Sequence, residues 1–253
     1  MAIEEIEMMR EQLLSFVNQT QGKIQIVDHP IPMQLQVEYA MEYQRLSPFV
    51  QHLNQHDLDC FVDKARTRLN YSKDLEEKRD LLTVLSSIKL PKAHEVLKEF
   101  INYGDSSLRS WARMADMGCR MNLIEDFTGD NLIFVASGLG GEDDSIRYSL
   151  VLLDAKQAPF SDFEKSLIEK ECRYQLECRS GKLNELDVQD RYVRMVFLMP
   201  ITESPRYFLN ALLNSINEFQ TIVQCPDAIS NNVYFTRENA YELLGEPQLQ
   251  LVI

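Results

Sequence analysis

The stretch DLEEKRDLLTVLSSIKLPKAHEVLKEFINYGDSSLRSWARMADMGCRM, residues 74–121, decides the fold of the first half of the chain. Its apolar residues recur at spacings of three and four, which is the pattern of amphipathic helices. Pro91 suits the first position of a helix, because the N–H that proline lacks would have no partner there. Gly104 ends that helix, and Asp105 is a candidate cap for the next one. We therefore expect three consecutive helices with the apolar faces Leu81, Leu82 and Leu85, then Ala93, Val96, Leu97, Phe100 and Ile101, then Leu108, Trp111, Ala112 and Ala115.

The same stretch resembles HEAT-type helical repeats over about residues 74–124. The resemblance rests on the leucine pair, on a Pro and a small Ala at the start of the second helix, and on the run Asp105-x-x-Leu108-Arg109 with Ala112 after it. In that family the Asp and the Arg link neighbouring repeats, and the stacked helices bury a continuous core. About one and a half repeats are visible, whereas stable stacks usually need about three, so a generic helical bundle stays open as the alternative.

More helices are expected upstream of this stretch. Residues 2–19, 34–46 and 57–70 show the same periodicity, with Asp57 as the candidate cap of the third. Residues 23–27 suit a strand or an extended connection. The prolines of 29–32 exclude a helix interior there, because each one removes a donor and restricts the residue before it.

The pattern changes from helix to strand after the turn at 127–130. The run 146–153, IRYSLVLL, becomes wholly apolar toward its end, which predicts a central strand. Other strands are expected at 132–136, 184–189, 192–199 and 233–235, with helices that start at Ser161, Ser204 and Thr236. From 146 to 236 the order is β-α-β-β-α-β, the ferredoxin-like order. The predicted fold class is therefore α+β, with a HEAT-like helical domain over 1–126 followed by a ferredoxin-like α/β sandwich domain over 127–253.

The second half of this predicted sandwich is similar to phosphotransferase-system IIA domains of the mannitol/fructose type. The matching residues are YVRMVFLMP (192–200), the helix after them, and NNVYFTRENAYELL (231–244). Those domains phosphorylate a His that lies earlier in the fold. The four His of this chain all lie at or before residue 94, so the resemblance implies only a catalytically silent relative.

Composition limits the class of partner. The net charge is −13, and such a chain repels the phosphates of nucleic acids and anionic lipids, which attract Lys and Arg. Acidic residues interrupt the apolar ones at the N-terminus, and no apolar run approaches the roughly 18 residues of a membrane span. We therefore expect a cytoplasmic protein that binds neither nucleic acid nor membrane. The five cysteines are widely spaced with no C-x-x-C pair, which favours reduced and mostly buried thiols.

Two local motifs are candidate sites. The glycine-rich loop 137–141 leads into three acidic residues and a strand, whereas a phosphate cradle opens onto a helix N-terminus, so a hairpin loop is expected. His52 and His56 have the i, i+4 spacing of metal ligands, but Leu53 stands where the zincin motif needs Glu. We expect no metal, no cofactor and no catalytic residue from these motifs. A pair of carboxylates brought together by the fold would leave no trace in the sequence.

These observations favour a non-enzymatic interaction or scaffold protein that binds a basic protein partner. The candidate partner-binding residues are Tyr103, Arg109, Trp111 and Arg113, on the predicted helices of the HEAT-like segment. The alternative is a ligand-sensing regulatory module with a small-molecule site in the α/β domain. The sequence does not distinguish a monomer from a dimer.

Overall fold

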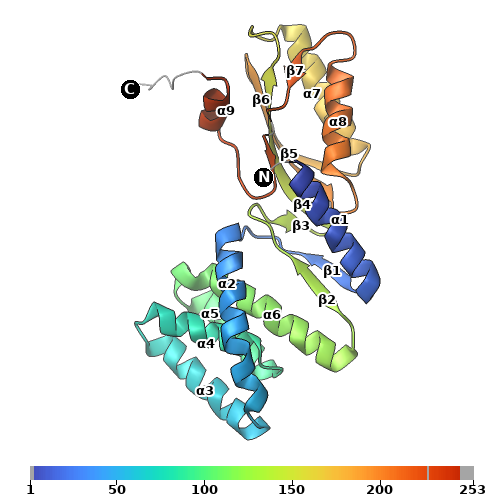
Figure 1. The fold of residues 1–253 in the computed structure, drawn as a ribbon. Helices are drawn as coiled ribbons and strands as arrows, with labels where there is room; N and C mark the ends of the chain where they lie inside the picture. The colour runs from blue at the N-terminus through green and yellow to red at the C-terminus, as the bar shows by residue number, and fades with distance from the viewer. Residues whose placement is uncertain (1–2, 227, 246–253) are drawn as a thin grey trace. The chain divides into compact units, whose positions relative to one another are not determined.

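The computed structural model describes residues 3–226 and 228–245, and it is a mixed α+β protein (Figure 1). The chain divides into two compact units. The helical unit comprises Thr20–Ile24 and Ile31–Phe134, and the sheet unit comprises Met1–Gln19, Gln25–Pro30 and Val135–Ile253. Among the described residues, every helix falls short of the length and apolarity that a membrane-spanning segment requires.

The helical unit is built on contacts of one long helix with two shorter ones. Its helices are α2 (Met33–Leu46), α3 (Gln55–Tyr71), α4 (Leu75–Ser86), α5 (Pro91–Tyr103) and α6 (Arg109–Thr128), with 3₁₀ turns at Ser47–His52 and Ser106–Leu108. α6 packs against both α4 and α5. Leu82, Leu85 and Leu97 are fully buried between them. Each such side chain stabilises the fold by roughly 1.5–3 kcal/mol relative to an exposed one.

Polar caps fix where these helices begin. The side chain of Asp74 accepts hydrogen bonds from the backbone N–H groups of Glu76 and Glu77, and Pro91 occupies the first turn of α5 as predicted. The predicted cap of α3 is wrong. Asn54 caps that helix, and its side chain accepts from the N–H of Asp57, 3.0 Å away. Asp57 is therefore the donor in the first turn rather than the cap.

The sheet unit contains an antiparallel sheet with a central strand. Its strands are β3 (Gly141–Glu142), β4 (Ser145–Asp154), β5 (Lys182–Val188), β6 (Tyr192–Pro200), β7 (Val223–Gln224) and β8 (Ile229–Ser230). The order is β3-β4-β6-β5, and β7 and β8 pair with β4. β4 has neighbours on both edges and is buried over most of its length, as its apolar sequence predicts.

Helices cover the two faces of this sheet differently. α7 (Asp162–Glu177) and α8 (Pro205–Ile216) lie side by side on one face, while the short α9 (Arg237–Leu243) lies on the other (Figure 1). Phe197 of β6 meets Phe208 of α8, with 4.9 Å between ring centroids. Alternate residues of β4 point the opposite way, and Val151 and Leu153 pack with Tyr192, Ala240 and Phe235.

The N-terminal helix α1 (Ile3–Thr20) belongs to the sheet unit through a buried ion pair. Glu7 pairs with Arg10, and its other carboxylate oxygen accepts a hydrogen bond of 2.7 Å from the hydroxyl of Ser204. Ser204 is the N-cap of α8. Arg10 in turn donates to the carbonyls of Ile201 and Thr202. The carboxylate of Glu7 is therefore placed near the positive end of the α8 dipole.

The boundaries of the units differ from the division at 126/127 that the sequence predicts. α1 and residues 25–30 group with the sheet unit, and residues 127–134 group with the helical unit. Periodicity places a helix in the chain but does not reveal that Glu7 meets a residue almost 200 positions later. The pattern change near residue 130 marks a change of secondary structure and not the boundary of a unit.

Two strand predictions need correction. Residues 132–136 are extended as predicted, but β2 (Leu132–Val135) pairs with β1 (Lys23–Ile26) in a separate two-stranded sheet. Residues 233–235 form no strand, and the pairing with β4 is made earlier by β7 and β8. The N–H of Phe235 donates to the Ser149 hydroxyl at 3.0 Å, so a side chain of β4 satisfies it in place of a backbone ladder.

Replacing Glu7 by Ala tests the anchor of α1. The change leaves Arg10 buried without its carboxylate, so we expect the free energy of unfolding to fall by about 3 kcal/mol. Urea denaturation followed by circular dichroism measures it. The matched control is Glu11→Ala on the exposed face of the same helix, which should change stability by less than about 0.5 kcal/mol. Equal effects of the two changes would contradict the anchoring role of Glu7.

Candidate functional site

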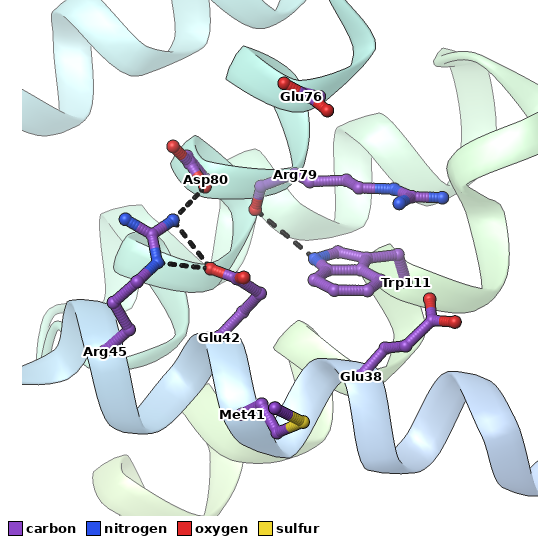
Figure 2. A pocket seen from close by; sticks show the side chains of 8 residues that line it. All are labelled: Glu38, Met41, Glu42, Arg45, Glu76, Arg79, Asp80 and Trp111. Carbon is purple, nitrogen blue, oxygen red and sulfur yellow. Dashed lines mark hydrogen bonds and ion pairs between the residues drawn. The ribbon is translucent and has the colours of Figure 1, made fainter.

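A groove of about 380 Å³ opens on the helical unit (Figure 2). Three helices contribute to its walls: α2, α4 and the first turn of α6. The residues that line it are Glu38, Met41, Glu42, Arg45, Glu76, Arg79, Asp80 and Trp111. The groove lies over a nearly buried indole and carries four carboxylates and two guanidinium groups, so its formal net charge is −2.

Trp111 forms the base of the groove. Only 2% of the residue is exposed, and its indole N–H donates to the Thr83 hydroxyl at 3.0 Å. The ring meets Tyr39 edge-on, with 5.3 Å between centroids. The Tyr39 hydroxyl donates to Ser86 at 2.8 Å. Trp111 is thus held by side chains from α2 and α4, and its polar atom is satisfied within the core.

Arg79 lies over this indole from the solvent side. Its guanidinium carbon is 5.0 Å from the ring centroid, which is the geometry of a cation–π contact. Within the described residues Arg79 forms no ion pair with a carboxylate. The positive charge at the groove is therefore held by an aromatic face and is not neutralised by a neighbouring acid.

The acidic residues of the groove fall into two pairs. Glu42 and Asp80 are both bound to Arg45, at 2.6 and 2.9 Å (Figure 2). Glu38 and Glu76 have no basic partner in the part of the chain that the structure describes, although Glu38 accepts a hydrogen bond from Gln34. Two carboxylates at this groove therefore remain available to a cation from outside.

The four residues predicted for partner binding do not come together. Trp111 is buried in the core instead of projecting from the surface, because its indole fills the space between α2, α4 and α6. Tyr103 is 88% exposed at the end of α5, and it lies outside the groove. Arg109 is exposed and Arg113 half-buried, also outside it. Of the predicted set, only Trp111 contributes to the groove, and it does so as the base.

The residues that form the walls of the groove are not among those that the sequence predicts. Glu38, Met41 and Arg45 stand on α2, and Glu76 and Arg79 on α4. Charged residues on helix faces are common, so their type gives no signal. One signal was present: apolar residues of α2 repeat every four positions on the side away from the core.

The glycine-rich loop leads into a hairpin, as predicted. β3 pairs with β4, with Gly141 opposite Ile146. Gly140 has a φ of +69°, and a Cβ there would lie 2.5 Å from the carbonyl oxygen of Asp28. The hydroxyl of Ser137 donates to the Gly140 carbonyl, so the loop is closed by its own polar groups. The glycines permit close approach of backbones.

The cysteines are less buried than expected. Cys119 and Cys172 are buried, and burial raises the pKa of each thiol to about 12. Cys60 and Cys178 are exposed, so the expectation of mostly buried thiols is wrong for these two. His56 contacts Cys60, but no group of three or more His, Cys, Asp or Glu within the described ranges is arranged to hold a metal ion.

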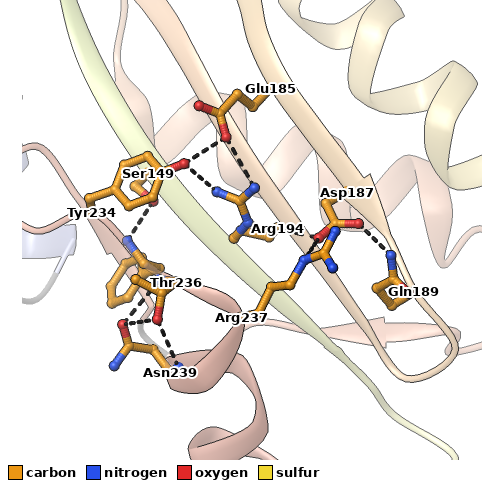
Figure 3. Close-up of polar contacts among 10 residues, drawn as sticks. Ser149, Glu185, Asp187, Gln189, Arg194, Tyr234, Thr236, Arg237 and Asn239 are labelled. Atoms are coloured by element: carbon orange, nitrogen blue, oxygen red, sulfur yellow. Dashed lines mark hydrogen bonds and ion pairs between the residues drawn. The ribbon is translucent and has the colours of Figure 1, made fainter. Parts of the chain in front are cut away.

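A polar network ties the segment after β8 to the sheet (Figure 3). Arg194 donates to the Tyr234 hydroxyl at 2.6 Å and to Glu185 at 3.0 Å, and Tyr234 donates to the same carboxylate. Asp187 accepts from Arg237 at 3.0 Å. These side chains bind one another, so the network attaches residues 234–237 to the sheet.

Comparison of the sequence with known proteins does not assign the chain to a family. No protein-family model matches the chain, and no curated protein is significantly similar to it in sequence.

His94, a half-buried residue of α5, predicts how the stability of the helical unit depends on pH. Desolvation lowers the pKa of His94, helped by the charges of Lys98 and Arg120 and opposed by Asp116, whose oxygen lies 3.0 Å from Nε2. The folded protein thus binds this proton less readily than the unfolded chain. Neutral His94 therefore contributes fully to the free energy of unfolding above pH 6.5, the ordinary pKa of histidine. This contribution is lost as the pH falls below that value.

We expect His94→Gln to reduce the loss of unfolding free energy between pH 7.5 and pH 5, measured by urea titrations at each pH. The exposed His52→Gln is the control and should leave the pH dependence as in the parent protein. A steeper pH dependence in His94→Gln would show that the sign is wrong.

Proposed function

We propose that this protein is a non-enzymatic interaction protein that binds a basic protein partner through the groove beside Trp111. The observation that carries the proposal is the pair of carboxylates, Glu38 and Glu76, that lack a basic partner within the described residues and stand above an aromatic base. A Lys or Arg side chain of a partner matches this arrangement, because its aliphatic stem suits the exposed Met41 side chain and its charge suits the carboxylates.

The rest of the chain supports the sign of the partner's charge. The net charge of −13 attracts positively charged proteins over a distance set by ionic strength, and it speeds their encounter. At the groove, a cation gains from each unpaired carboxylate without displacing Arg45 from its two acids. An anionic partner would gain only from Arg79 and would face four carboxylates.

The finer description of the fold is also a proposal: HEAT-like packing in the helical unit and a ferredoxin-like sandwich in the sheet unit. The strand order supports the ferredoxin-like sandwich. Across the sheet the strands follow in the order β7/β8, β4, β6, β5, which in chain order is fourth, first, third, second. A helix follows the first strand, β4, and another follows the third, β6. HEAT-like packing is supported by the helices α4, α5 and α6, which are consecutive in the chain and pack against one another. Asp105 departs from the HEAT pattern, in which the Asp links neighbouring repeats. Its side chain accepts a hydrogen bond from the nearby backbone N–H of Ser107 and caps the 3₁₀ turn Ser106–Leu108.

Charge reversal at the groove tests the proposed function. The parent protein and a Glu38→Lys, Glu76→Lys variant are each used as bait, and captured proteins are quantified by mass spectrometry. We expect basic proteins on the parent bait and at least a tenfold loss on the variant, a change of about 1.4 kcal/mol in binding free energy.

The matched control is Glu4→Lys, Glu11→Lys, which makes the same change of charge on exposed positions of α1. Capture that falls equally with both double variants would indicate general electrostatic attraction and would contradict a role of the groove. The absence of any basic protein on the parent bait would contradict the function itself.

A further inference from the structure

Helix α2 has two apolar faces, and the described part of the chain covers only one of them. Leu35, Tyr39, Tyr43 and Leu46 face the core of the helical unit. Met33, Val37 and Met41 are 37, 53 and 66% exposed. Residues four apart in a helix lie on the same side, so these three form one stripe along the helix. Ala40, also exposed, lies beside it.

This stripe, Met33, Val37 and Met41, continues into the groove. Met41 belongs to both, since it is the last residue of the stripe and lines the groove beside Glu38 (Figure 2). An apolar surface along α2 thus ends at the unpaired carboxylates of Glu38 and Glu76. Single exposed apolar residues are ordinary on protein surfaces, whereas an aligned row beside a groove is typical of an interaction site.

The chemistry of the stripe favours a helical occupant. The flexible, unbranched side chains of two exposed methionines adapt to the shape of a partner, and such surfaces commonly receive the apolar face of an amphipathic helix. Eight residues separate Met33 from Met41, which corresponds to about 12 Å of helix. This length matches the apolar side of a docked helix of two to three turns.

We propose that α2 and the groove together bind an amphipathic basic helix of a partner protein. Its apolar side lies on Met33, Val37 and Met41, and a Lys or Arg at the edge of that side enters the groove toward Glu38 and Glu76. The inference rests on the proposed function and names the form of its partner. Charge complementarity selects this occupant: a second copy of this chain, with a net charge of −13, would bring like charge to an acidic groove.

The test uses a synthetic 18-residue peptide with Leu repeated at spacings of three and four, Lys at the flanking positions, and no Trp. Binding is measured by anisotropy of a label on the peptide and by the emission of Trp111, the single Trp of the chain. We expect saturable binding to the parent protein. The same peptide with Glu in place of each Lys should not bind.

Val37→Glu and Met41→Glu separate this inference from simple charge attraction. Each change adds a negative charge, so attraction alone would strengthen binding of the basic peptide. The inference expects the reverse, at least a tenfold loss, because the apolar contact is removed. Met8→Glu is the matched control: it replaces an exposed methionine of α1, 52% accessible, and should not weaken binding.

The outcomes separate the two proposals. Failure of the peptide to bind, or equal binding to the parent protein and the stripe variants, overturns the helix inference. In that case the capture experiment still decides the proposed function, because basic partners that depend on Glu38 and Glu76 would remain. Loss of peptide binding in Val37→Glu and Met41→Glu, with circular dichroism and urea midpoints unchanged, supports the inference.

Discussion

The packing of Trp111 between three helices is the constraint on which the helical unit and its groove depend. The indole comes from the first turn of α6, its N–H is bound to Thr83 of α4, and its edge meets Tyr39 of α2. Because a buried indole N–H without a partner is costly, this hydrogen bond fixes the rotation of α4 relative to α6. Glu76, Arg79 and Asp80 of α4 line the groove. The groove therefore depends on the hydrogen bond and the packing of the Trp111 indole.

Local sequence predicted the elements of this structure better than their assembly. The apolar run of β4 indicated a central strand, and the capping box at Ser161 located the start of α7, which is confirmed. Both signals are contained within a few residues. The attachment of α1 to the sheet unit depends on Glu7 meeting Ser204, and no local pattern carries such a contact. The same holds for β7 and β8, whose two-residue pairings are too short to leave a periodic signal.

Of the candidate site, the sequence predicts only the negative charge. The composition predicts a basic partner, but the residues that the sequence indicates are aromatic and basic ones on α5 and α6. Trp111 illustrates why: an aromatic residue on a helix is equally compatible with core and surface until its neighbours are known. Glu38 and Glu76 are 38 positions apart, with a 3₁₀ turn and the whole of α3 between their helices, and they line one groove because α2 and α4 pack together.

The exposed apolar stripe on α2 contributes little to the stability of the fold. Met33, Val37 and Met41 remain largely accessible in the folded chain, so they gain little of the free energy that burial provides. The covered face of α2 already supplies Tyr39, Tyr43 and Leu35 to the core. Folding of the helical unit therefore does not explain the second apolar face. A helix that is apolar on both sides gains free energy when a second molecule covers the exposed side, and under the proposed function the acidic groove at its edge would favour a positively charged molecule.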